Sequence, residues 1–135
     1  MARRIVLAAP QGSARALLGL LEPGFRQQAE ITLVCETPPD DLALQVEVQP
    51  VKGLWEACRW ADYVAIDLER EALPELRAEF QARRASVRAE MQVLVRSPMP
   101  CGALAGCGAC TVEARGRVLL ACEDGPVFDL RQLMR

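Results

Sequence analysis

The 135-residue sequence contains no histidine. Without imidazole, the chain cannot form a histidine general base, a Ser-His or Cys-His nucleophile pair, or a mixed Cys/His metal site. Aromatic residues are scarce at 4%, and the formal net charge of −2 provides no basic surface. These two features argue against a protein that binds nucleic acid.

Long apolar runs are also missing. No stretch approaches the length of a transmembrane helix, so we expect no membrane association. The run Ile5–Ala9 follows two arginines but is interrupted at once by Pro10-Gln11-Gly12, which makes it too short for the core of a signal peptide. We therefore expect a cytoplasmic protein, in which thiols stay reduced and clustered cysteines bind metals rather than form disulfides.

The first 96 residues alternate short apolar strands with helical segments. Strands are expected at Ile5–Ala9, Glu30–Cys35, Leu44–Gln49, Tyr63–Asp67 and Met91–Val95, and helices at Ala14–Glu22, Gly53–Ala61 and Glu69–Ala85. Ser13 is expected to cap the first helix, and Pro23-Gly24 to end it. Pro74 is tolerated only in a first turn, so the third helix can begin near Leu73. This alternation predicts an α/β fold, a small parallel sheet of about five strands flanked by helices.

The loop after the first strand is where a dinucleotide-binding fold places its phosphate site. Here it reads Ala8-Ala-Pro-Gln-Gly-Ser-Ala14, with one glycine in place of G-x-G-x-x-G. Ser13 and Arg15 could hold an anion at the helix start, but a plain strand–helix connection is the simpler interpretation. Asp67 has no partner base and is expected to cap the following helix. We therefore expect a Rossmann-like domain over residues 1–96 without an intact dinucleotide fingerprint.

Other conspicuous residues of this part have structural interpretations. The arginines in and just after the third helical segment alternate with glutamates, which favours a solvated helix face over a partner-docking patch. They are Arg77, Arg83, Arg84 and Arg88. Cys35 and Cys58 are expected to be small buried residues on a strand and a helix.

The composition changes at Ser97-Pro98-Met99-Pro100, where we place a boundary between residues 1–96 and 97–135. The second part holds four of the six cysteines, Cys101, Cys107, Cys110 and Cys122, in the spacing C-x5-C-x2-C-x11-C. Glycine and alanine dominate the first gaps, which leaves the backbone free to approach a metal centre closely. Thr111–Glu113 and Arg117–Ala121 are expected to form a hairpin that returns the chain to Cys122.

Three kinds of centre fit these thiols. The plant-type [2Fe-2S] loop has the order C-x4-C-x2-C with a separate fourth cysteine, and this sequence has one residue more in the first gap. A structural zinc site usually shows two closely spaced cysteine pairs, whereas this segment contains one. A redox-active Cys107–Cys110 dithiol would need a thioredoxin-like context. The spacing favours the iron–sulfur centre.

The motifs Met99-Pro-Cys-Gly102, Cys107-Gly-Ala-Cys110 and Cys122-Glu-Asp-Gly-Pro-Val-Phe128 resemble the cluster domain of the electron-transfer subunit of class 1B dihydroorotate dehydrogenase. The resemblance implies that Cys101, Cys107, Cys110 and Cys122 ligate a [2Fe-2S] cluster. In that family the cluster relays electrons between the FMN of a catalytic subunit and an FAD in the electron-transfer subunit, which passes them to NAD.

The chain departs from the family in two respects. The family usually has four residues between the first two cysteines, so the loop over Leu104 is expected to be reshaped. Nothing here corresponds to the family's flavin-binding barrel or its glycine-rich nicotinamide loop, so FAD and NAD are not expected to bind this chain alone. We expect a subunit that is not catalytic alone and that docks on a flavoprotein catalytic subunit for pyrimidine biosynthesis; a homodimer is a further possibility. The alternatives are a zinc-stapled, non-redox module that assembles or regulates a partner enzyme, and a freestanding ferredoxin-like carrier. Arg96, Arg115 and Arg117 are expected to offset the cluster charge.

Overall fold

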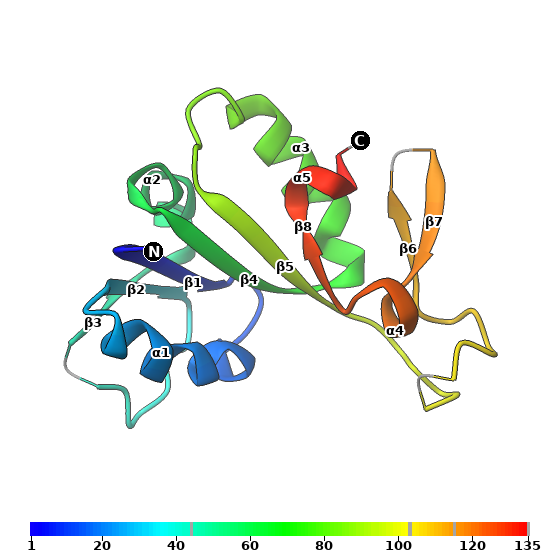
Figure 1. Cartoon of the computed structure of the whole chain (residues 1–135), viewed down its shortest axis with the longest axis horizontal. Helices are drawn as coiled ribbons and strands as arrows, with labels where there is room; N and C mark the ends of the chain where they lie inside the picture. Colours follow the sequence, from blue (N-terminus) through cyan, green and yellow to red (C-terminus); the bar gives the residue numbers. More distant parts are fainter. Residues whose placement is uncertain (44, 103, 115, 135) are drawn as a thin grey trace.

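The computed structural model describes residues 1–43, 45–102, 104–114 and 116–134. Within them, six strands form one sheet in the order β3-β2-β1-β4-β5-β8. The parallel strands are β1 (Arg4–Ala9), β2 (Glu30–Cys35), β3 (Val46–Gln49), β4 (Tyr63–Glu69) and β5 (Glu90–Arg96). The predicted five-stranded parallel arrangement is therefore confirmed (Figure 1). Leu44, expected to begin the third strand, lies outside the described residues.

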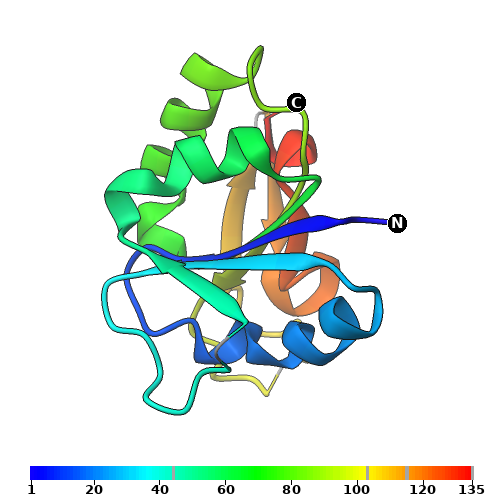
Figure 2. The ribbon, with the colours of Figure 1, turned by 90° about the vertical axis from the view of Figure 1, so that its left-hand side faces the viewer.

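Helices cover both faces of the sheet (Figures 1 and 2). On one face lie α2 (Leu54–Trp60), α3 (Leu73–Arg83) and α5 (Leu130–Leu133), which bury leucines and Phe80 against the strands. On the other face lie the 3-10 helix η1 (Arg15–Leu20) and α1 (Leu21–Arg26), with Leu17 buried against β1 and β2. The continuous apolar runs of the strands follow from this burial on both faces.

The segment after Arg96 leaves the sheet and later returns to it. It forms the hairpin β6 (Thr111–Ala114) and β7 (Arg117–Leu120), then the short helix α4 (Ala121–Asp124), and finally β8 (Val127–Asp129). Strand β8 pairs antiparallel with β5, with Phe128 opposite Val93. The hairpin was predictable from the sequence, but β8 was not, because three residues are too few to show an alternating pattern.

Two predictions about the first helical segment are wrong. Pro23-Gly24 does not end a helix, since both residues lie inside α1, where proline occupies the tolerated first turn. Gly24 is buried there, and a Cβ at this position would lie 2.7 Å from Cδ1 of Ile31, so a larger residue would have to displace the Ile31 side chain. Ser13 does not cap η1 either; the N-cap is Ala14, with a left-handed φ of 60° and no side-chain hydrogen bond.

The third helical segment begins as expected. A short 3-10 turn, η3 (Arg70–Ala72), follows β4, and the α-helix α3 starts at Leu73 with Pro74 in its first turn. Cys35 and Cys58 are buried, which confirms their structural interpretation. No helix among the described residues is long and apolar enough to span a membrane.

Candidate metal centre

The hairpin brings Cys110 and Cys122 together. Cys110 directly precedes β6 and Cys122 lies in the first turn of α4, just after β7, so the β6–β7 pairing sets the two side by side. The Ala121 amide donates to the Cys110 carbonyl at 2.9 Å, and the two Sγ atoms are 3.3 Å apart. Cys110 is 1% exposed. The β6–β7 hairpin therefore brings together two cysteines that are separated by eleven residues in the sequence.

Cys101 and Cys107 form a second pair in the loop between β5 and β6. Hydrogen bonds from the Gly106 amide and then from the Cys107 thiol lower the pKa of Cys101 to about 6 from 9.0. The Ala109 amide donates to Cys107 Sγ at 3.4 Å. Backbone amides that point at sulfur are the donors that stabilise thiolates and sulfur-ligated metals.

The two pairs affect each other. The Cys122 amide is the main cause of the lowered pKa of Cys110, and hydrogen bonding to Cys110 is the main cause of the raised pKa of Cys122. Charge on Cys101 also raises the pKa of Cys122, whereas the Ala105 amide lowers it. All four sequence-predicted cysteines thus belong to one electrostatic neighbourhood. Among the described residues, no group of three or more His, Cys, Asp or Glu is arranged to hold a single metal ion.

The loop adopts backbone conformations that glycine favours. Gly102 and Gly108, each next to a cysteine, have φ values of 64° and 67°. Ala105 has a φ of 59°, which is unusual for a residue with a Cβ. Ala105 lies in the gap that is one residue longer than in the plant-type spacing, and the preceding Leu104 is 82% exposed. The loop thus presents an apolar side chain to the outside beside the four thiols.

The residues after Cys122 connect α4 to β7 by a hydrogen bond and to the core by packing. The Asp124 carboxylate accepts from the Leu120 amide at 2.8 Å, which closes the turn between β7 and α4. Gly125 lies against the Phe128 ring, where a Cβ would approach Cε2 and Cζ at 2.5 Å. The Phe128 ring is in turn buried against the core. These contacts give a physical reason for the order Asp-Gly-x-x-Phe after the fourth cysteine.

Residues at the end of β4 bind Arg96, which directly precedes the cysteine-containing segment, residues 97–135. Nε of Arg96, the last residue of β5, donates to Oδ1 of the buried Asp67 at 2.6 Å, and Nη1 lies 3.5 Å from Glu69. Asp67 therefore does not cap the next helix as predicted, because its partner is 29 residues further along the chain. Arg96, expected to offset charge at the cysteines, is bound to these carboxylates. Arg115, expected in the same role, lies outside the described residues.

Two arginines of the α/β part donate hydrogen bonds to backbone carbonyls in and next to β6. Nη1 of Arg70, in η3, donates to the Ala109 carbonyl at 2.5 Å and to the Thr111 carbonyl at 3.3 Å. Arg77, in α3, donates to the Glu113 carbonyl at 2.8 Å, so it is not simply part of a solvated helix face. Arg70 could not be identified from the sequence, because every residue carries a backbone carbonyl acceptor.

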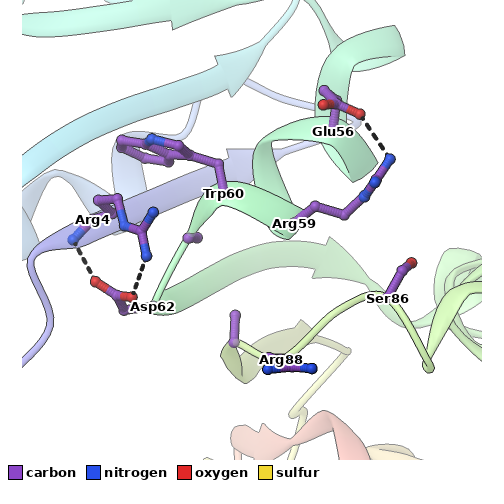
Figure 3. A pocket seen from close by; sticks show the side chains of 9 residues that line it. Arg4, Glu56, Arg59, Trp60, Asp62, Ser86 and Arg88 are labelled. Atoms are coloured by element: carbon purple, nitrogen blue, oxygen red, sulfur yellow. Dashed lines mark hydrogen bonds and ion pairs between the residues drawn. The ribbon is translucent and has the colours of Figure 1, made fainter.

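A separate hollow of about 630 Å³ lies at the opposite end of the sheet, where β1 and β4 begin (Figure 3). Four of its charged side chains form two ion pairs: Arg4 pairs with Asp62 at 3.0 Å and Arg59 with Glu56 at 3.3 Å. The Arg4 guanidinium also lies 5.8 Å from the centre of the Trp60 ring. These pairs join the start of β1 to the residue before β4 and bridge one turn of α2.

The fold and the paired thiols together define the chain as an α/β sheet that carries a cysteine-rich segment. The chain superposes on a chain of the NADH-dependent reduced ferredoxin-NADP oxidoreductase, a structure solved for its insights into flavin-based electron bifurcation, with a TM-score of 0.67. The identity is 14%, so the likeness concerns the fold alone. The match covers 96% of this chain and 53% of that one, so this chain spans about half the length of that protein.

Residues 97–134 match the family model of the iron–sulfur cluster binding domain of dihydroorotate dehydrogenase B. The match spans the segment that contains the four clustered cysteines, and it confirms the resemblance noted in the sequence. No curated protein matches the chain.

Proposed function

We propose that the chain is an electron-transfer subunit that holds a [2Fe-2S] cluster through Cys101, Cys107, Cys110 and Cys122. The observation that carries the proposal is the pairing of the thiols, Cys101 with Cys107 and Cys110 with Cys122, inside the matched domain. A two-iron cluster needs two thiolates for each iron, and two adjacent pairs provide that donor set.

The residues around the thiols suit a group whose negative charge increases on reduction. When bound, the cluster supplies a one-electron carrier. Backbone amides of Gly106, Ala109 and Ala105 point at three of the sulfurs, and such donors stabilise negative charge there. Asp67 binds Arg96 just before the loop between β5 and β6, and Arg70 binds the Ala109 carbonyl near the end of that loop. Both ends of the loop are thus fixed on the α/β part. We therefore keep the division into residues 1–96 and 97–135 as a proposal about roles, a mount and a cluster domain.

The partner we propose is a flavoprotein, namely a dihydroorotate dehydrogenase catalytic subunit of pyrimidine biosynthesis. Two features support docking beside the cysteines: the matched domain and the exposed Leu104 next to them. The α/β part has Arg96 bound to Asp67 where the strand order reverses, and its first loop has one glycine, so we propose that FAD and NAD bind elsewhere in the complex. The six free cysteines are compatible with the reducing cytoplasm, which we propose as the location.

Metal analysis and partner reduction test the proposal together. The purified full chain should contain about two irons and two acid-labile sulfides per chain, no zinc, and a visible absorbance that is free of flavin. Mixing with the catalytic subunit and dihydroorotate under argon should bleach that absorbance. A colourless chain loaded with zinc would refute the cluster, and a coloured chain that never bleaches with this flavoprotein would refute the partner.

A further inference from the structure

Arg70 contacts the backbone on both sides of one predicted ligand. It is the first residue of η3, directly after β4, and its side chain is 28% exposed. The carbonyls that accept from its Nη1 belong to Ala109 and Thr111, the two neighbours of Cys110. One guanidinium nitrogen therefore fixes the peptide units before and after the buried cysteine.

The guanidinium is itself held in place. Nε and Nη2 of Arg70 each lie 3.3 Å from Oε1 of Glu71, so its planar head is fixed between one carboxylate and two carbonyls. A planar fork of donors can make such simultaneous contacts, whereas a lysine ammonium presents a compact point charge on a flexible stem. Glu71 is 70% exposed, so solvent screens its carboxylate more than it screens the guanidinium. The result is a partly buried positive charge with a set orientation beside the Cys110–Cys122 pair.

We propose that Arg70 is a positioning residue that presets Cys110 for cluster binding and whose charge favours the reduced state of the cluster. This inference rests on the proposed function, because it assigns a role toward the same centre. Reduction adds one electron to an already anionic group, and a fixed positive charge nearby makes that addition more favourable. The two effects are separable, since one depends on the shape of the side chain and the other on its charge.

Arg77 provides a matched control. It makes the same kind of bond to the same hairpin, at Glu113, but its acceptor does not adjoin a cysteine. Both arginines line a cleft of about 230 Å³ between α3 and β6, so a shorter side chain at either position leaves similar free space. Differences between variants at 70 and at 77 therefore report proximity to Cys110 rather than loss of an arginine in general.

The test compares Arg70→Gln, Arg70→Lys and Arg77→Gln in the full chain. With dithionite as electron donor, we expect the midpoint potential to fall in Arg70→Gln and to stay near wild type in Arg70→Lys and Arg77→Gln. Release of iron to a chelator should be about tenfold faster in both Arg70 variants, because a charge-assisted hydrogen bond is lost or weakened. An Arg70→Gln protein that matches Arg77→Gln in both potential and iron release overturns the proposal.

Alkylation after chelation tests the preset position without any metal. In wild type and Arg77→Gln, iodoacetamide should modify exposed Cys107 quickly and buried Cys110 slowly. In Arg70→Gln the rate at Cys110 should rise about tenfold, with the rate at Cys107 unchanged. If the wild-type chain never carries iron, the proposed function fails, and equal Cys110 rates in all three proteins would overturn the role of Arg70 as well. A rise at Cys110 alone in that case would support positioning and refute the effect on reduction.

Discussion

The most demanding test of the packing around the fourth cysteine is Gly125→Ala. A Cβ at this position would lie 2.5 Å from both Cε2 and Cζ of Phe128 and 3.2 Å from the Ala121 carbonyl oxygen. The ring cannot move away freely, since Phe128 is 6% exposed and its strand pairs with β5 opposite Val93. The new methyl group must therefore displace either the ring or the turn that follows α4.

The expected cost follows from two opposing effects. Overpacking of a well-filled site costs about 1–3 kcal/mol. Alanine also lowers the entropy of the unfolded chain relative to glycine, which offsets about 0.4–1 kcal/mol. We expect a net loss of about 1–2 kcal/mol in the free energy of unfolding. Because α4 carries Cys122, the iron content of the variant should fall as well.

Urea unfolding of the chelated full chain, followed by far-UV circular dichroism, measures this loss. Gly106→Ala is the control within the cysteine loop, because a Cβ there meets nothing within 4 Å and its φ is not positive. Its stability should not fall, and a gain of up to about 1 kcal/mol is expected. The double variant with Phe128→Leu should recover part of the Gly125→Ala loss. Strict additivity, or a Gly125→Ala protein as stable as wild type, would refute the packing argument.

The remaining predictions concern the thiols and their loop. Cys122→Ser should abolish the visible absorbance, whereas Cys58→Ala, which removes a buried thiol with a pKa of about 12 far from the cysteine loop, should keep it. In chelated protein the alkylation rate at Cys101 should fall about tenfold per pH unit below pH 6 and level off above pH 7, because its pKa is lowered to about 6 from 9.0; a rate that still rises toward pH 9 would contradict this. Gly108→Ala, at a φ of 67°, should cost about 1–2 kcal/mol by urea unfolding. Leu104→Asp should preserve the iron content but slow reduction by the flavoprotein about tenfold, and unchanged reduction would exclude docking at this loop.

The fold was predictable where single residues or short runs carry enough information. The run Glu30–Cys35 is buried over nearly its whole length, so its apolar composition alone defines a strand. The start of α3 at Leu73 follows from the steric limits of Pro74. In both cases the determining interaction is local or depends only on hydrophobicity.

The predictions that were wrong or missing concern residues whose partners lie far away in the sequence. Asp67 was expected to cap the helix that follows it. Instead it accepts a hydrogen bond from Arg96, which the pairing of β4 with β5 brings close. Gly24 looked like a helix breaker because the sequence does not reveal the Ile31 side chain packed against it. Arg70 was not identified at all, since its partners are carbonyl oxygens that every residue has. Tertiary contacts of this kind decide how the α/β part holds the cluster domain.

For the candidate site, the cysteines could be identified from the sequence, but their arrangement in pairs could not. The four cysteines were identifiable from spacing, because thiolates and flanking glycines are rare enough to be informative. Their pairing was not, since it depends on the β6–β7 register that sets Cys110 beside Cys122. The proposal of a two-iron centre rests on this arrangement of the sulfurs, which the sequence alone does not reveal.

Low-temperature EPR of the full chain before and after dithionite tests the central claim most directly. We expect a silent oxidised protein and, after reduction, the signal of one paramagnetic centre for about every two irons, with no flavin radical. Cys122→Ser should lose that signal under the same conditions. A reduced protein that stays EPR-silent, with zinc in place of iron at the four thiols, would contradict the assignment of this chain as an electron carrier.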